Sequence, residues 1–445
     1  MTLIKNCIIV NEGNSFKGSV LIKGKIISKI FEEEDLLPES VEIIDANGLI
    51  MLPGVIDDQV HFREPGSTHK GDIASESAAA VLGGVTSYME MPNTNPPATT
   101  RDLLEEKYKI AKKSSFANYS FYLGGTNNNL AEIINADPSS ICGIKLFMGS
   151  STGNMLVDND ESLEAIFKNS PMLIAAHCED ENTIQTNMQN AKEMYGDDIP
   201  FSLHPIIRSR EACIKSSEKA INLALKYNSS LHILHISTKE EIDIIHEASK
   251  KNPKITGEVC VHYMLFDNKL YCEMGSKIKC NPAIKTNEDK ESIINAVKHG
   301  IIKVVATDHA PHTIDDKNNK YLTAPSGLPL IQHSLQIMWE LHLQGHFSIE
   351  EIADRMSHSP AIRFGVEKRG FIREGYFADI VLVDPNKSIT VDKSNINYKC
   401  KWSPFEGETF RSSIVHTFVN GKHAVAFGKL TGNRAGERLK FLHEK

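Results

Sequence analysis

The chain has 445 residues, of which 41% are hydrophobic and 24% are charged, and its formal net charge is −8. Such a chain can form one large globular domain of about 250–300 residues and a smaller one. The acidic balance argues against nucleic-acid binding, and no apolar run approaches the ~18 residues of a membrane span. Eight scattered cysteines without a C-x-x-C pair indicate reduced thiols and a cytoplasmic location.

Both ends of the chain consist of short β-rich runs. Residues 1–53 contain "TLIKNCIIV" and "GSVLIKGKIISKI", and residues 369–445 contain "FADIVLVDPNKSITV" and "SSIVHTFVNGKHAVAFG". Gly and Asn separate these runs, as is typical of antiparallel strands. We therefore expect a small β-sandwich domain built from both termini, and we interpret the N-terminus as a strand and not as a signal peptide.

Residues 54–368 have a different pattern, in which short apolar runs alternate with amphipathic stretches such as "DLLEEKYKIAKK" and "SEKAINLALKY". Repeated βα units of this kind predict a parallel (β/α)₈, or TIM-like, barrel, whose chemistry lies where the strands end. The eight candidate strands are "GVIDDQVHF", "VTSYMEMP", "NYSFYLG", "GIKLFMG", "MLIAAHC", "LHILHIS", "KITGEVC" and "KVVATDH".

Polar side chains recur at the ends of these runs. A single histidine would most simply be a hydrogen-bonded core or surface residue. Imidazoles and a carboxylate at the same end of several strands instead predict one shared site for a divalent metal such as zinc. The candidate ligands are His61, His177, His235 and Asp308.

Lys145 lies inside the apolar run "GIKLFMG". Burial should lower the pKa of its amine, and a neutral amine can react with carbon dioxide to give a carbamate whose two oxygens could bridge two metal ions. The alternative is a lysine with a buried stem and an ammonium paired with an acid. Taken alone, Lys145 favours the second interpretation.

These segments resemble the amidohydrolase superfamily and, within it, the dihydroorotases. "PGVIDDQVHFREPG" resembles the D-x-H-V-H-x-R-x-P-G segment of that family, and "MPNTNPP" resembles M-P-N-T-x-P. "IKLFMGSSTG" resembles the segment that carries a carboxylated lysine in some members, and "AAHCED" and "ILHIST" resemble the two later histidine segments. "ATDHAPHTIDDK", the most specific segment, resembles the second family signature, and the resemblance spans nearly the whole chain.

The resemblance implies a zinc hydrolase that interconverts dihydroorotate and N-carbamoyl-aspartate in pyrimidine synthesis. It makes Asp308 a metal ligand and the general base, and His61, Lys145, His177 and His235 the other ligands of one or two zinc ions. The substrate carboxylate would be bound by the guanidinium of Arg63. Further substrate contacts are implied for Asn93, Asn281, His312 and Gly327.

Gln59 departs from the family, which has a histidine ligand at that position. A neutral amide is a weak zinc ligand, and three interpretations follow. One metal could be held by His61, a Lys145 carbamate and Asp308, with little or no help from Gln59. The site could instead use a single ion centred on Lys145, His177 and His235. Catalysis could also be lost, leaving an inactive partner of aspartate transcarbamoylase.

The retained ligands and Arg63 favour an active enzyme over the inactive partner. The alternative enzyme is an allantoinase or dihydropyrimidinase, whose substrates lack the ring carboxylate that Arg63 would bind.

Glu258 and His262 lie near the end of another predicted strand. Each could equally orient a metal ligand or serve only in structural packing. Residues 309–330 are expected to form a loop that closes over the site. A homodimer is the default expectation.

Overall fold

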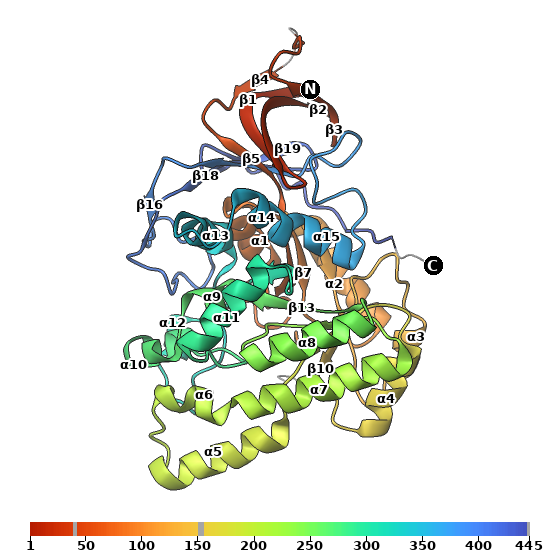
Figure 1. The fold of residues 1–445 in the computed structure, drawn as a ribbon, viewed down its shortest axis with the longest axis vertical. Coiled ribbons are helices and arrows are strands. Elements are labelled where there is room, and N and C mark those ends of the chain that lie inside the picture. Colours follow the sequence, from red (N-terminus) through yellow and green to blue (C-terminus); the bar gives the residue numbers. More distant parts are fainter. Residues whose placement is uncertain (39–41, 150–154, 443–445) are drawn as a thin grey trace.

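The computed structural model describes residues 1–38, 42–149 and 155–442. A sheet domain lies at one end of the molecule and a helix-covered barrel occupies the rest (Figure 1). The chain passes from the sheet domain into the barrel after its first five strands and returns to the sheet domain near its end.

The sheet domain combines both termini in one nine-stranded sheet. Its central junction is the antiparallel pairing of an N-terminal strand with a C-terminal strand, in which Met51 lies opposite Leu382. Apolar side chains from both halves, including Ile9 and Phe418, form a core cluster of their own. The strands are β1 (Thr2–Asn11), β2 (Asn14–Lys23), β3 (Ile26–Glu32), β4 (Glu42–Asp45), β5 (Ile50–Pro53), β15 (Ile380–Asp384), β18 (Ser413–Val419), β19 (Lys422–Ala426) and β20 (Lys429–Leu430).

The eight apolar runs form the barrel strands that the sequence predicts. The third run is divided at Tyr122 into two short strands, and the backbone N–H of His61 donates to the carbonyl of His309 (2.7 Å) where the last strand meets the first. The predicted fold class, a (β/α)₈ barrel with a small β domain built from both termini, is confirmed, and the strands of the predicted β-sandwich belong to a single nine-stranded sheet. The strands are β6 (Val55–Val60), β7 (Val85–Glu90), β8 (Asn118–Phe121), β9 (Leu123–Gly124), β10 (Ile144–Phe147), β11 (Ile174–His177), β12 (Leu231–Ile233), β13 (Ile255–Cys260) and β14 (Val304–Ala306).

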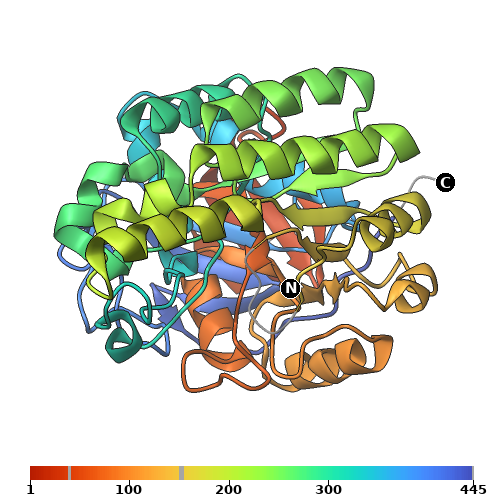
Figure 2. The same ribbon diagram turned by 90° about the horizontal axis from the view of Figure 1, so that it is seen from below.

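Helices surround the barrel strands when the molecule is seen from below (Figure 2). The two predicted helical stretches lie in α2 and α7, which begin after the capping side chains of Thr100 and Ser209. The helices are α1 (Ile73–Leu82), α2 (Arg101–Ser114), α3 (Leu130–Ile134), α4 (Asp160–Asn169), α5 (Glu181–Tyr195), α6 (His204–Ile207), α7 (Arg210–Tyr227), α8 (Lys239–Lys251), α9 (Val261–Leu265), α10 (Tyr271–Met274), α11 (Asn287–Lys298), α12 (Ile314–Lys317), α13 (Ser334–Leu343), α14 (Ile349–Ala353) and α15 (Ser359–Phe364). Strands β16 (Ile389–Thr390) and β17 (Thr409–Phe410) pair with each other as a two-stranded antiparallel ribbon.

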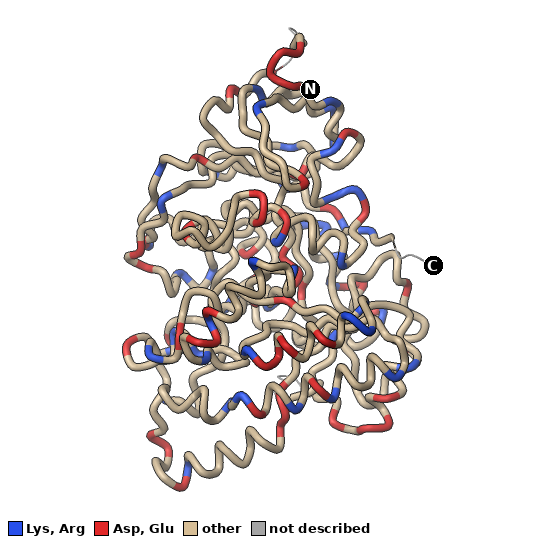
Figure 3. Tube along the Cα trace, in the orientation of Figure 1, with Lys and Arg blue, Asp and Glu red and all other residues tan. Residues whose placement is uncertain are grey.

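Basic and acidic residues are interspersed along the described chain and do not gather into a basic face (Figure 3). Within residues 1–38, 42–149 and 155–442, no helix combines the length and the hydrophobicity needed to cross a bilayer. The domain limits predicted from the sequence are residues 1–53 and 369–445 for the two parts of the β domain and residues 54–368 for the barrel. These limits remain predictions.

Candidate active site

The residues that the sequence assigned to the site all line one cavity of about 330 Å³ at the carboxyl ends of the barrel strands. Strands β6, β10, β11 and β12 bring ligand candidates to it, and the segment after β14 brings Asp308. The predicted residues in its wall are Gln59, His61, Arg63, Asn93, Lys145, His177, His235, Asn281, Asp308, His312 and Gly327.

The first pair of predicted ligands consists of His61 and Asp308. Nε2 of His61 lies 3.1 Å from Oδ1 of Asp308, and Nδ1 of the same ring lies 2.8 Å from Oδ1 of Asn93. Burial lowers the pKa of His61, against the opposing effect of Asp308, and so favours the neutral imidazole that binds metals. Asn93 thereby fixes the ring orientation of His61, in addition to lining the cavity.

The second pair consists of His177 and His235, whose Nδ1 and Nε2 atoms lie 2.9 Å apart. Burial lowers the pKa of both imidazoles, and in the case of His235 the pKa falls well below its usual value. Nδ1 of His235 is buried and has no hydrogen-bond partner within the described residues. Two neutral imidazoles whose ring nitrogens lie this close together can supply two of the four ligands of a zinc ion.

Lys145 stands on β10 with its Nζ 4.6 Å from the centre of the Phe147 ring. Burial lowers the pKa of its amine to about 7, against the opposing effect of Asp308. Within the described residues Lys145 forms no direct ion pair with a carboxylate, although Asp308 and Glu258 both act to raise its pKa against the effect of burial. The motif "IKLFMGSSTG" continues into residues 150–153, which lie outside the described residues.

Gln59 turns its amide nitrogen toward Asp308, with Nε2 lying 3.3 Å from Oδ1. Its carbonyl oxygen accepts a bond from the thiol of Cys260 (3.7 Å). An amide N–H₂ group has no lone pair for a metal. In this arrangement Gln59 therefore orients the carboxylate of Asp308 and does not act as a ligand.

Arg63 and His312 form one wall of the cavity. Arg63 donates through Nε to the carbonyl of Pro311 (3.0 Å), and its terminal nitrogen lies 2.9 Å from Nε2 of His312. Burial lowers the pKa of Arg63 to about 10, which leaves its guanidinium charged at neutral pH. Gly327 closes this wall at φ +139°, where an added Cβ would meet the carbonyl oxygen of Ala310 at 2.5 Å. Only glycine fits there.

Residues 309–330 cover the cavity as the sequence predicts, and they are held by two buried lysines. Lys317 at the end of α12 donates to the carbonyls of Lys279, Pro325 and Gly327, and Lys279 donates to those of Tyr321 and Ala324. The loop is thus fixed by charge-assisted hydrogen bonds in its covering position. Its movement on substrate binding stays a prediction.

Three of the predicted site residues adopt a positive φ that L-residues rarely use. The angles are 70° for Arg63, 41° for His235 and 50° for Asp308. Such conformations cost about 1–3 kcal/mol and persist where the surrounding structure imposes them, which is common at functional sites. The strain therefore coincides with the residues that the sequence singled out.

Glu179 and Arg208 support the second pair and were missed from the sequence. Oε2 of Glu179 lies 2.8 Å from Nε2 of His177, and Arg208 donates through Nε to Oε1 of Glu179 (3.0 Å). Burial would raise the pKa of Glu179, but Arg208 and His177 hold it well below its usual value. Glu179 follows His177 by two positions in "AAHCED", and this spacing was the available signal.

Glu258 and His262 differ in their contacts. Oε1 of Glu258 accepts from the backbone N–H of His235 (3.3 Å), so Glu258 supports the loop that carries a predicted ligand. Both ring nitrogens of His262 lack hydrogen-bond partners within the described residues, and its ring packs on Tyr263 at 4.1 Å. The structure therefore gives Glu258 a supporting contact and His262 a packing contact.

Replacing Glu179 by Gln should weaken metal binding by about 10–100-fold, because the anion that orients His177 is lost. Metal affinity measured by competition with a chelator checks this expectation. Glu181→Gln, two positions further on at the start of α5, is the matched control and should leave affinity unchanged. Equal affinities in the two variants would contradict a supporting role for Glu179.

A (β/α)₈ barrel with buried imidazoles, a lysine and a carboxylate around a cavity at its carboxyl end defines a class, the metal-dependent hydrolases of this fold. Residues 50–424 match the amidohydrolase family. The chain belongs to that family and is a metal-dependent cyclic amidohydrolase.

Relatives and solved structures agree on the family but carry different names. Proteins named dihydroorotase from Methanosphaera stadtmanae and Bacillus subtilis are 30% and 31% identical, covering 94% and 96% of this chain and 95% and 99% of their own lengths. The L-hydantoinase (dihydropyrimidinase) of Arthrobacter aurescens superposes with a TM-score of 0.93 at 26% identity, covering 99% of each chain. The dihydropyrimidinase of Brevibacillus agri has a TM-score of 0.91 at 25% identity, covering 100% of each chain.

Proposed function

We propose that this chain is a dihydroorotase, which hydrolyses the ring amide of dihydroorotate to N-carbamoyl-aspartate and catalyses the reverse ring closure. The observation that carries the proposal is the wall formed by Arg63 and His312 beside the predicted ligands. A guanidinium at the edge of such a cavity suits a substrate that bears a carboxylate beside its reactive amide. Asn93, Asn281 and Gly327 line the same cavity and complete the proposed substrate contacts.

The donor set fits zinc. It comprises neutral imidazoles and a carboxylate in two pairs, His61 with Asp308 and His177 with His235, and the pKa of Lys145 makes a neutral amine available for carboxylation. We propose that these residues hold one or two zinc ions, and that a carbamate formed on Lys145 would supply further oxygen ligands. A bound zinc ion would polarise the ring carbonyl and lower the pKa of water beside it.

Asp308 is the proposed general base. Its carboxylate takes a proton from the attacking water as the C–O bond forms at the ring carbonyl carbon. It then delivers that proton to the amide nitrogen as the ring C–N bond breaks. Gln59 donates to Oδ1 of Asp308 and so helps to keep this carboxylate directed into the cavity.

Replacing Gln59 by His should strengthen binding of the ion held by His61 and Asp308 by about tenfold or more, because an imidazole replaces an amide that offers no metal ligand. Zinc titration of the chelated protein measures this change. Gln59→Asn, which keeps an amide, serves as the control. A Gln59→His variant with unchanged zinc affinity would place this position outside the metal site.

Replacing Arg63 by Met should raise KM for dihydroorotate by about 100-fold, because a desolvated charge-assisted contact to the carboxylate is lost. Steady-state kinetics of dihydroorotate hydrolysis test this expectation. Dihydrouracil and hydantoin, which have no ring carboxylate, are the internal control, and their KM should be unaffected. Efficient turnover of these uncharged rings by the unaltered protein, with none of dihydroorotate, would contradict the proposal.

The second candidate is a hydantoinase or dihydropyrimidinase activity, which the close superposition with those enzymes supports. The third is an inactive partner of aspartate transcarbamoylase, which co-purification without turnover would support. We favour dihydroorotase because Arg63, His312 and the predicted ligands occur together in one cavity. The homodimer, the transcarbamoylase contact and the cytoplasmic location stay predictions from the sequence.

A further inference from the structure

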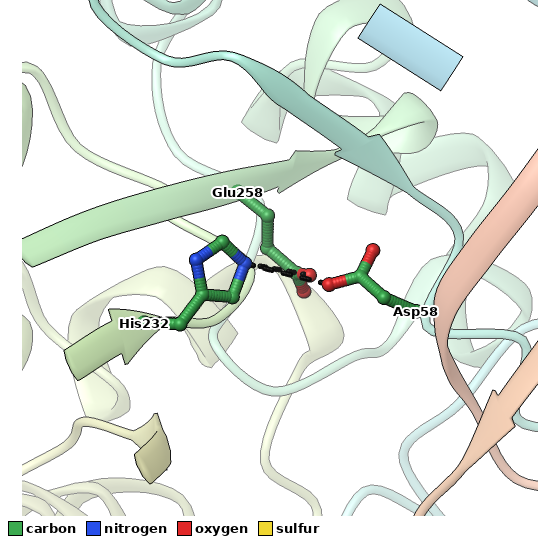
Figure 4. Close-up of side chains that lie close together, drawn as sticks. All are labelled: Asp58, His232 and Glu258. Atoms are coloured by element: carbon green, nitrogen blue, oxygen red, sulfur yellow. Dashed lines mark ion pairs between the residues drawn. The ribbon is translucent and has the colours of Figure 1, made fainter. Parts of the chain in front are cut away.

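A second group of metal-binding side chains lies inside the barrel, outside the wall of the cavity. Asp58 on β6, His232 on β12 and Glu258 on β13 place ligand atoms within 4.8 Å of one another. All three side chains are completely buried, and the two carboxylates face Nε2 of His232 (Figure 4). Barrel interiors are normally filled by branched apolar residues, so a group of charges there needs an explanation.

The atoms that face one another in this group form only long ion pairs, at 3.4 Å. Both carboxylate oxygens of Asp58, Nε2 of His232 and Oε2 of Glu258 make no hydrogen bond to any part of the chain that the structure describes. A buried polar atom without a partner costs about 1–3 kcal/mol, and charged atoms cost more. Four such atoms in one place indicate that something other than protein satisfies them.

The spacing of these atoms matches a metal site. Nε2 of His232 lies 3.4 Å from Oδ2 of Asp58 and 3.4 Å from Oε2 of Glu258, beyond the range of a good hydrogen bond. Two ligands that each lie about 2.1 Å from a tetrahedral zinc ion are themselves about 3.4 Å apart. The observed separations are therefore those of atoms that share an ion.

The remaining atoms of the group are fixed by the surrounding structure. Nδ1 of His232 bonds Oγ1 of Thr256 (2.7 Å), which leaves Nε2 as its ligand atom. Oε1 of Glu258 accepts from the backbone of His235 (3.3 Å), which directs Oε2 at the group. Tyr122 donates to the carbonyl of Asp58 (2.9 Å). Outer contacts of this kind orient metal ligands.

Arg363 and Lys145 lie near this group, but neither forms an ion pair with Asp58 or Glu258 within the described residues. Arg363 donates to Oγ1 of Thr256, to Oγ of Ser230 and to the carbonyls of Leu231 and Lys254, all of which are neutral acceptors. Burial and the adjacent Asp58 carboxylate raise the pKa of Glu258 well above its usual value, because two buried carboxylates cannot both stay charged without compensation. One divalent cation would supply that compensation.

We propose that Asp58, His232 and Glu258 bind a divalent transition-metal ion inside the barrel, separate from the ions of the active-site cavity. The ion has a structural role, because its ligands lie outside the cavity wall. Its burial makes exchange with solvent slow, so that a chelator removes the ions of the cavity before this one.

The test is the zinc content of the full-length protein expressed with zinc and measured by elemental analysis before and after dialysis against a chelator. We expect one zinc ion per chain to remain after dialysis and to be released on denaturation. Asp58→Asn should lose that ion. Glu241→Gln, which alters a buried carboxylate bonded to Ser217 and Thr238, is the matched control and should keep it. His61→Asn should also keep it, because His61 belongs to the cavity.

Equal chelator-resistant zinc in the Asp58→Asn and Glu241→Gln variants would overturn the proposal, as would its absence from the unaltered protein. If Asp58→Asn fails to fold, anomalous diffraction at the zinc edge from crystals of the unaltered protein decides the question. A peak between Asp58, His232 and Glu258 supports the site, and its absence overturns it. Neither outcome depends on the substrate, so a failure here is distinct from failure of the proposed activity.

Discussion

The Asp308→Asn variant should hydrolyse dihydroorotate at least about 1,000-fold more slowly than the unaltered protein, because the general base is lost. Asparagine has nearly the shape of aspartate but cannot carry the proton from water to the leaving nitrogen. It is also a poorer partner for His61, which lies 3.1 Å from the carboxylate. The loss should appear in kcat and only weakly in KM.

Asp315→Asn is the control for this variant, because Asp315 lies on the same loop with its side chain exposed. It should retain nearly full activity. Both variants should unfold at temperatures close to that of the unaltered protein, since neither change removes packed apolar volume. An Asp308→Asn enzyme with kcat within tenfold of the unaltered protein would remove Asp308 from the proposed proton transfer.

The Lys145→Met variant should lose at least about 100-fold in activity together with zinc from the cavity, because methionine cannot form the proposed carbamate. The pKa of about 7 for Lys145 supports this chemistry, since the amine is neutral and nucleophilic above that pH. Bicarbonate should accelerate recovery of the chelated, unaltered protein when zinc is returned, and it should have no effect on Lys145→Met. Zinc content and recovery rate are the measurements.

Lys317→Met is a matched control, because burial also lowers the pKa of Lys317 to about 7. Its Nζ donates to the carbonyls of Pro325 and Gly327, so its loss should loosen the covering loop but spare the zinc content. Full zinc content and a bicarbonate effect in Lys145→Met would exclude a carboxylated lysine from the site.

The barrel and the ligand candidates of its cavity could be predicted from strand periodicity, whereas Arg63, Asn281, His312 and Gly327 were implied by the resemblance to the dihydroorotases. Polar residues at the ends of apolar runs, such as His177 and His235, must meet at the carboxyl end of a parallel barrel. The break at Tyr122, which divides the third strand, has no comparable signal in an otherwise continuous apolar run.

Other features depend on side-chain directions that periodicity does not fix. The amide nitrogen of Gln59 points toward Asp308. Arg208 donates a hydrogen bond to Glu179, which lies 29 positions earlier in the sequence. Asp58 lies next to Gln59 in the sequence, yet it is directed into the barrel interior and not into the cavity. Such contacts need the three-dimensional arrangement of several strands.

The central claim is that the cavity residues bind zinc and thereby hydrolyse the ring amide of dihydroorotate. Its most direct test is the rate of dihydroorotate hydrolysis by the purified protein, followed through chelation and return of zinc. We expect hydrolysis with at least one tightly bound zinc ion per chain, loss of activity on chelation and recovery when zinc returns. A protein fully loaded with zinc that leaves dihydroorotate intact would contradict the account.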